Sequence, residues 1–154
     1  LTFSSDYIVA KWSKKVFLKP LEVITILKIP KKDLPFGKSK QESYISLSLN
    51  RNEEIVSTKN VFFLPFKKLQ IPIPNLNFES SINDKEKQIT VDITTQKFAK
   101  GVWVSSLSNE NFSDNFFNLN ANGHKAIHLP YQNDQDPREL IKTIKIKSLW
   151  DSFN

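Results

Sequence analysis

Gln88-Ile89-Thr90-Val91-Asp92-Ile93-Thr94 alternates apolar, β-branched side chains with polar ones along its whole length. Successive side chains of a strand point to opposite faces of a sheet, whereas a helix brings together residues that are three and four apart. The stretch therefore predicts a β-strand with one buried face. The same alternation at 43–50 and 125–129 predicts two more strands.

Working outward from these stretches, turn-forming residues separate short apolar runs at close intervals. Closely spaced strands of this kind predict an all-β sandwich or barrel. Helices have little support, since only a short turn is expected at 32–36, where Pro35 limits its length. The further predicted strands are 21–29, 55–64, 76–82, 101–107, 116–119 and 140–147, and the turns are 30–37, 50–52, 83–85, 120–123 and 133–137.

A domain boundary is predicted at Gln70-Ile71-Pro72-Ile73-Pro74, because the two prolines cannot donate ladder hydrogen bonds and keep the chain extended. The boundary divides the chain into modules of residues 1–70 and 71–154. Each module is small for an independent core, so we expect the two to share an interface.

The composition of the 154 residues, 39% of them hydrophobic, is that of a globular protein and not of a disordered one. The absence of Cys excludes disulfides and thiolate chemistry, and three Gly leave little material for a phosphate-binding loop. The net charge of +6 comes almost entirely from Lys, with Arg only at Arg51 and Arg138, which favours solvated strand faces over nucleic-acid binding. No apolar run approaches the roughly 18 residues of a membrane span, so neither nucleic acid nor a membrane is an expected partner. Since the sequence starts at Leu1 and contains no Met, we expect a piece of a longer protein.

No catalytic or metal constellation stands out in the sequence. His124 and His128 are the only histidines, and on a strand they would stand about 13 Å apart, too far to share a metal ion. No Ser lies in a glycine-flanked elbow, and no two carboxylates are singled out as a glycosidase pair. We therefore predict no catalytic, cofactor or metal residues in this chain.

The aromatic residues raise the alternative of a sugar-binding platform. Trp103 lies between Val102 and Val104, a pattern that predicts burial on both faces and a role in core packing. Trp150 is the better candidate for an exposed side chain, and thus for a sugar or domain contact. The remaining candidates are Trp12, Tyr7, Tyr44 and Tyr131.

Several stretches resemble the C-terminal region of β-mannosidases of glycoside hydrolase family 2, in the order that this family has. Residues 60–153 resemble the last module of these enzymes, and residues 7–68 resemble later strands of the module before it. The most specific stretch is Phe112-Ser113-Asp114-Asn115-Phe116-Phe117. The others are Asn60-Val61-Phe62-Phe63-Leu64, Ile89-Thr90-Val91-Asp92-Ile93, Phe98-Ala99-Lys100-Gly101-Val102-Trp103-Val104 and Ile146-Lys147-Ser148-Leu149-Trp150-Asp151.

The resemblance implies two immunoglobulin-like β-sandwich modules, of which the N-terminal one, the mannosidase Ig/CBM-like module at 1–70, is incomplete. Enzymes of this family are retaining exo-β-mannosidases that remove terminal, non-reducing β-D-mannose with two glutamates on a (β/α)₈ barrel. The resemblance places both glutamates upstream of this chain, which is therefore predicted to be inactive alone and to support the barrel. It also implies a periplasmic, secreted or lysosomal parent.

The implied partners are the upstream barrel and sandwich domains of the same polypeptide and the β-mannoside substrates of the parent enzyme. Within the most specific stretch, the Ser, Asp and Asn side chains can bond neighbouring backbone groups and hold a sharp entry into the next strand. Phe116 and Phe117 should point to opposite faces. A contact of the Asp114 loop with the barrel or substrate is the alternative.

Two other functions stay open at this point: a carbohydrate-binding module, and an immunoglobulin-like interaction domain unrelated to sugars. An incomplete N-terminal module would expose a strand edge and part of an apolar face. We therefore expect either self-association through that edge or poor order in residues 1–6.

Overall fold

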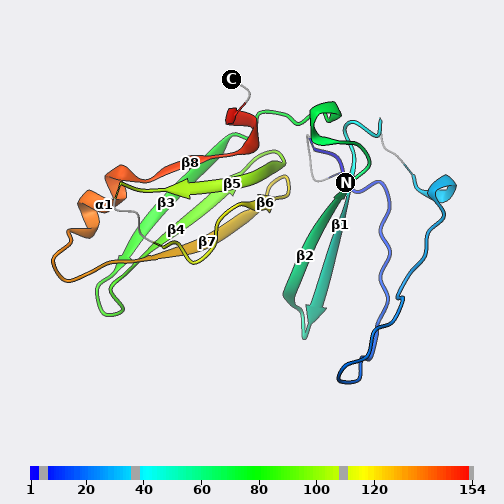
Figure 1. Cartoon of the computed structure of the whole chain (residues 1–154), viewed down its shortest axis with the longest axis horizontal. Helices are drawn as coiled ribbons and strands as arrows, with labels where there is room; N and C mark the ends of the chain where they lie inside the picture. Colours follow the sequence, from blue (N-terminus) through cyan, green and yellow to red (C-terminus); the bar gives the residue numbers. More distant parts are fainter. Residues whose placement is uncertain (4–6, 36–38, 108–110, 153–154) are drawn as a thin grey trace.

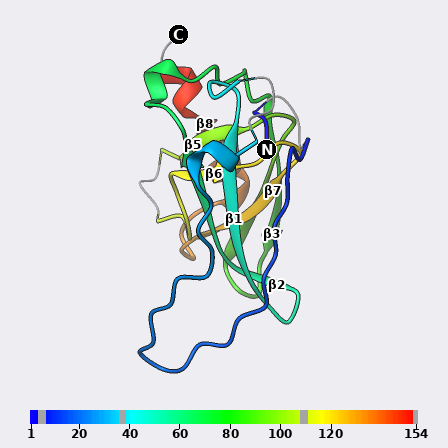
Figure 2. The ribbon, with the colours of Figure 1, turned by 90° about the vertical axis from the view of Figure 1, so that its right-hand side faces the viewer.

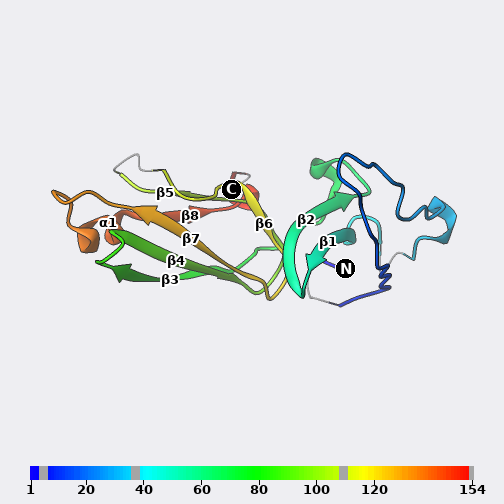
Figure 3. The same ribbon diagram turned by 90° about the horizontal axis from the view of Figure 1, so that it is seen from below.

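The computed structural model describes residues 1–3, 7–35, 39–107 and 111–152, and its regular structure is nearly all β (Figure 1). The C-terminal part is a sandwich of two antiparallel sheets. One sheet has the order β3-β4-β7, formed by Leu76–Asn83, Gln88–Thr95 and His124–Pro130. In the other, β5 (Ala99–Ser105) lies between β6 (Phe117–Leu119) and β8 (Lys145–Lys147). Figure 3 shows the two sheets as separate layers, β3 and β4 in one and β5 and β8 in the other.

The alternating stretch at 88–94 forms β4, as predicted, and its apolar residues occupy the centre of the sandwich. Ile89, Val91 and Ile93 are fully buried. They pack in one cluster with apolar residues of β5 and β7. Strand β7 pairs with β4 so that Ile127 lies opposite Val91. Burial of each such side chain is worth about 1.5–3 kcal/mol, which makes this cluster the main stabilising element of the module.

The N-terminal module contains one hairpin, β1 (Tyr44–Arg51) and β2 (Glu54–Phe62), as the alternation at 43–50 predicted. Asn52 and Glu53 connect the strands, and both have positive φ, as a type I′ turn requires. Leu47, Leu49 and Val61 lie on the outer face of the hairpin by strand pairing, and all three are exposed, Leu47 at 50%.

The segment before the hairpin differs from the prediction. The stretch 21–29 was expected to be a strand, but it forms none in the described part of the chain, and Leu21 lies in a turn at φ 63°. Figure 1 and Figure 2 show this part of the chain as a loop that extends away from both sheets of the C-terminal sandwich. A strand needs a ladder partner for its backbone groups, and the described residues provide none here. Between residues 7 and 35, the one regular element is a 3₁₀ turn at Lys31–Asp33, which overlaps the short turn expected at 32–36. The Phe36-Gly37 part of the predicted turn lies outside the described residues.

The predicted strand at 140–147 is wrong over its first half, where the helix α1 (Pro137–Thr143) forms instead. Asp136 caps the helix, because its Oδ1 accepts the Arg138 N–H at 2.8 Å, and Pro137 occupies the first turn, where its missing N–H costs nothing. The β-branched residues of this stretch favour a strand, and the helix forms in spite of this preference. Only Lys145–Lys147 pairs with β5.

The two modules share an interface, as expected, built from aromatic rings and asparagine side chains. Phe3 and Tyr44 of the N-terminal module and Phe98 of the sandwich are buried together. Beside them, Asn60 and Tyr44 both donate to Asn120 Oδ1 at 3.1 Å. The interface fixes the start of the chain. Thr2 forms an isolated β-bridge with Ser43, and the side chain of Phe3 is fully buried. The poor order expected at the N-terminus therefore does not apply to residues 1–3. Residues 4–6 lie outside the described residues.

Candidate functional site

The histidines and carboxylates do not form a site in the described part of the chain. His124 and His128 lie on the outer side of β7, and His128 Nδ1 is 3.3 Å from Thr90 Oγ1. Among residues 1–3, 7–35, 39–107 and 111–152, no three His, Cys, Asp or Glu side chains lie close enough to hold a metal ion. The polar side chains with the most hydrogen bonds to both sheets lie in the stretch 112–117.

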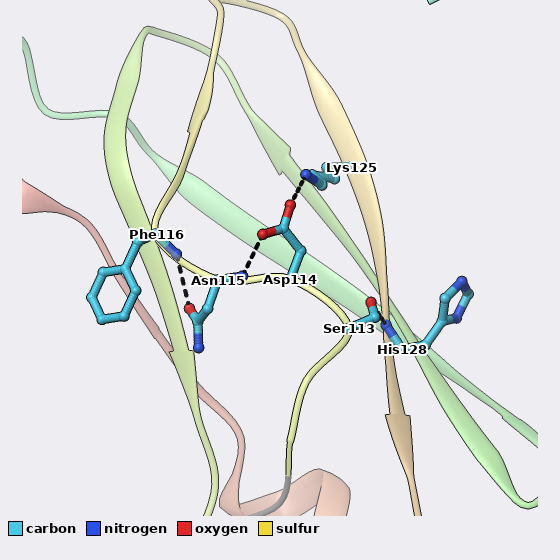
Figure 4. Close-up of polar contacts among 6 residues, drawn as sticks. All are labelled: Ser113, Asp114, Asn115, Phe116, Lys125 and His128. Atoms are coloured by element: carbon cyan, nitrogen blue, oxygen red, sulfur yellow. Dashed lines mark hydrogen bonds and ion pairs between the residues drawn. The ribbon is translucent and has the colours of Figure 1, made fainter. Parts of the chain in front are cut away.

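This stretch crosses from one sheet of the sandwich to the other (Figure 4). Its first polar residue is joined to β7: the Ser113 N–H donates to the His128 carbonyl at 2.8 Å, and Ser113 Oγ accepts the His128 N–H at 2.9 Å. Phe112 packs against the central cluster and anchors the start of the crossing. Ser113 thus extends the β3-β4-β7 sheet by one pair of hydrogen bonds.

Asn115 joins the same stretch to the opposite sheet. Its Oδ1 accepts the Val104 N–H at 2.8 Å, and its Nδ2 donates to the Val104 carbonyl at 2.8 Å. The Oδ1 atom also accepts the N–H of Phe116 at 3.2 Å. One side chain therefore bonds two backbone groups of β5 and fixes the conformation of the residue that follows it.

Asp114 lies between these two anchors and forms an ion pair with Lys125 of β7. It also accepts the Asn115 N–H at 2.7 Å. The hydrogen bond from Lys125 is the largest influence on Asp114 and lowers the pKa of its carboxyl group, against a smaller opposite effect of desolvation. Lys125 Nζ lies 4.5 Å from the centre of the Phe117 ring, which holds the lysine over the crossing.

Phe116 has φ 59°, a left-handed conformation that is rare for a bulky side chain. Phe117 packs against the central cluster while Phe116 is 70% exposed, so the two rings point to opposite sides as expected. Figure 4 shows the Phe116 ring directed away from the Asp114–Lys125 pair. The ring instead lies parallel to that of Trp103, with 6.3 Å between centroids and 4° between planes.

The predicted burial of Trp103 is wrong, since 42% of the residue is exposed. Val102 and Val104 face the core, so strand alternation directs the residue between them outward, where no second layer covers β5 in the described part of the chain. Trp150, the predicted exposed aromatic, is half-buried in a 3₁₀ turn, Leu149–Ser152. The more exposed of these two tryptophans is therefore Trp103, and no sequence signal indicated that Phe116 would stack on it. Of the other candidates, Tyr44 and Tyr131 are buried, and Trp12 and Tyr7 are exposed in the N-terminal module.

Two surface hollows adjoin the Trp103 ring. One, of about 370 Å³, is bordered by Trp103 and by polar residues that include Ser105, Asn111 and Asn115. The other, of about 410 Å³, is bordered by both rings and by Lys100 and Ser148. Trp103 thus forms part of the wall of both hollows, and the arrangement can hold a small ligand against an aromatic surface.

The comparisons with known proteins cover both modules. A mannosidase family described as an Ig-fold domain matches residues 71–152, and the mannosidase Ig/CBM-like domain family matches residues 1–68. A search of curated proteins gave no significant match. Among the described residues, no helix has the length and apolar character needed to cross a bilayer.

Proposed function

The chain belongs to the Ig-fold domain family of mannosidases, as a non-catalytic accessory region, and we propose that its parent enzyme is an exo-β-mannosidase that removes terminal, non-reducing β-D-mannose. The observation that carries this proposal is the succession of two mannosidase modules, the Ig/CBM-like one before the Ig-fold one, over nearly the whole chain. We propose the division of the chain at residue 70 on the same basis.

The proposed role of the region is support of the catalytic barrel and of the sandwich domains of the same polypeptide. The uncovered apolar face of the β1-β2 hairpin supports this role. Leu47, Leu49 and Val61 are all exposed on one face of a hairpin whose other face is docked on the sandwich. An exposed apolar face of this kind is typical of a surface that is covered by another domain.

The crossing at 112–117 supports a structural role as well. Its polar side chains bond backbone groups of both sheets, and the Asp114 carboxylate is engaged by Lys125. Retaining hydrolysis needs two carboxyl groups about 5–5.5 Å apart across a substrate. Several carboxylates of the described residues cap a turn or a helix or form surface ion pairs, for example Asp136 at α1 and Glu139 with Lys142.

The experiment compares the parent enzyme with this chain on aryl glycosides. The parent is expected to hydrolyse an aryl β-mannoside and to leave the aryl α-mannoside and β-galactoside unchanged, whereas the isolated 154-residue chain hydrolyses none of them. A parent that prefers the α-mannoside or the β-galactoside contradicts the proposed specificity. Hydrolysis by the purified chain, abolished by substitution of one of its own carboxylates, contradicts the non-catalytic role.

A further inference from the structure

The exposed pair Trp103 and Phe116 is not explained by core packing or by the crossing that leads to it. Phe116 is held in a left-handed conformation although its ring is 70% exposed. Strained residues persist only where the surroundings fix them, and they are concentrated at functional sites. Here the Asn115 side chain fixes the backbone, and the result is the presentation of a phenyl ring on the surface.

The two rings form a parallel, stacked pair, and both remain partly exposed. Their planes differ by 4° and their centroids are 6.3 Å apart. The face of an aromatic ring carries partial negative charge, which attracts polarised C–H groups. One face of a pyranose ring presents several such C–H groups, so a sugar ring is a suitable ligand for this surface.

The rings are held by rigid elements, which favours binding of a ligand without further ordering. Trp103 lies on β5 opposite Lys147 of β8, and the residues on either side of it are fixed in the core. Phe116 is fixed through Asn115, which is bonded to Val104 of the same strand. A platform that exists before binding avoids the entropy cost of forming it, and this cost limits the affinity of flexible sites.

The rims of the two hollows provide hydrogen-bonding groups. Ser148 borders one hollow, but it is buried and its Oγ donates to Asp151 at 2.9 Å, so Ser152 is the exposed hydroxyl there. Asn111 and Ser105 border the other hollow. Both hollows fall at the lower end of the range of roughly 300–1,000 Å³ that is typical of small-molecule sites.

The charge near the rings disfavours a cationic ligand. Lys100 borders the site, with its Nζ directed at the Phe66 ring, 4.9 Å away, and at Asn118. The exposed Lys147 of β8 stands opposite Trp103. No carboxylate borders either hollow among the described residues. A hydroxyl-rich neutral molecule therefore fits these surroundings better than a cation.

We propose that Trp103 and Phe116 form a stacking platform for a pyranose ring of a mannosyl oligosaccharide, with the two flanking hollows receiving the neighbouring parts of the glycan. The identity of the sugar rests on the proposed function; the existence of the platform does not. The region thereby holds the glycan outside the catalytic barrel and contributes binding to the parent enzyme.

The test is a calorimetric or NMR titration of the full 154-residue chain with β-1,4-linked mannotriose, with cellotriose for comparison. We expect saturable binding of mannotriose, and Trp103→Ala and Phe116→Ala should each weaken it by about tenfold or more, as removal of one of two central aromatic contacts does. Trp12→Ala is the matched control, because it removes an exposed tryptophan of the other module and should leave the affinity unchanged.

Phe116→Gly separates binding from folding. Glycine adopts positive φ without strain, so this variant should melt at or above the temperature of the parent chain and yet lose mannotriose binding. The variant Phe116→Tyr should still bind mannotriose. A variant Phe116→Gly that is clearly destabilised would show instead that the ring is a structural contact, and would overturn the proposal.

Three further results decide the matter. Absence of saturable binding of either trisaccharide by the folded chain overturns the platform. Self-association of the chain that is lost in Trp103→Ala, without any effect on sugar binding, also overturns it and identifies the face as a contact between copies. Platform-dependent binding of cellotriose but not mannotriose upholds the platform and contradicts only the mannosyl identity, while the hydrolysis of aryl mannosides by the parent tests the proposed function separately.

Discussion

Asn115 bonds both backbone groups of Val104 through its side chain, with both distances at 2.8 Å. The strand β6 pairs with β5 only as far as Val102. The Asn115 amide therefore continues the pairing of β5 by one side chain where the neighbouring strand has ended. This satisfies a backbone N–H and C=O that would otherwise face solvent or remain without a partner.

We expect Asn115→Ala to lower the free energy of unfolding by about 1–3 kcal/mol, because it leaves two partly buried backbone groups of Val104 without their partners. Asp114→Ala is the matched control at the adjacent position. Its ion pair is half-exposed, so its loss should cost less than about 1 kcal/mol. Chemical denaturation of both variants measures the difference, and equal losses in the two would contradict the role assigned to Asn115.

The Asp114–Lys125 pair should make a small, pH-dependent contribution to stability. The folded state lowers the pKa of Asp114, so this contribution is present above the pKa of the unfolded chain, about 3.9, and is lost as the pH falls through the folded value. Comparison of the parent chain with Asp114→Asn between neutral and acidic pH should show their stabilities converging at the acidic end. High salt should also reduce the difference. A gap that does not change with pH contradicts the ion-pair origin.

Substitution of two glycines by alanine should destabilise the chain for two different reasons, a steric clash at Gly123 and backbone strain at Gly101. A Cβ at Gly123 would lie 2.7 Å from the carbonyl oxygen of Asn120, the atom that accepts the Gly123 N–H in the turn, with Asn122 at φ 55° as a type II turn requires. We expect Gly123→Ala to cost about 1–3 kcal/mol and to disturb the interface side chain of Asn120. Gly101→Ala meets no atom within 4 Å, but it has φ 56° and should cost only the backbone strain of about 1–2 kcal/mol. Thermal melts of both variants measure the loss of stability. The NMR chemical shifts of Tyr44 report on the interface and distinguish a clash from backbone strain, because they should change in Gly123→Ala alone.

The central sandwich could be predicted from the sequence because its strands and turns are determined by short stretches of neighbouring residues. The alternation of β4 defines both its strand and its buried face, and the turn residues divide the chain at nearly the right places. The helix α1 could have been found too, since Asp136 before Pro137 and Glu139 is a helix-start signal. The β-branched residues that follow it favour a strand, but the capped first turn outweighs this preference.

The site could be predicted only in part. The Ser-Asp-Asn stretch indicates bonding to the backbone, but not that Asn115 would bond Val104, which lies in another strand. Exposure of Trp103 depends on whether a second layer covers the outer face of its sheet, and a strand pattern contains no information on that. The positive φ of Phe116 is imposed by Asn115 and runs against the preference of the residue itself, so no local propensity could indicate it.

The contribution of Tyr44 to the stability of the interface between the modules should decrease at alkaline pH. Its buried hydroxyl donates to Asn120 at 3.1 Å, and desolvation raises its pKa above the ordinary value near 10. Its contribution to stability is therefore full below about pH 10 and is lost as the pH rises through the folded pKa. Tyr44→Phe should cost about 0.5–1.5 kcal/mol at neutral pH and remove this part of the alkaline loss. Denaturation of both proteins at several pH values between 7 and 11 measures it, and parallel pH profiles would contradict the prediction.

The N-terminal hairpin should open more readily than the sandwich and should mediate self-association. Its outer face exposes Leu47 and Leu49, whereas the inner face of β4 is completely buried, so the backbone hydrogen bonds of β1 and β2 are protected by less apolar packing. We expect native-state hydrogen exchange to be faster in β1 and β2 than in β4. Association between copies should decrease in Leu47→Lys and Leu49→Lys, because a charge blocks pairing of apolar faces and edges. Thr58→Lys adds the same charge on the opposite face of the same hairpin and serves as the control. Equal protection of hairpin and sandwich in a strictly monomeric sample would show that the N-terminal module is as complete as the C-terminal one, and would remove the reason to expect another domain on its outer face.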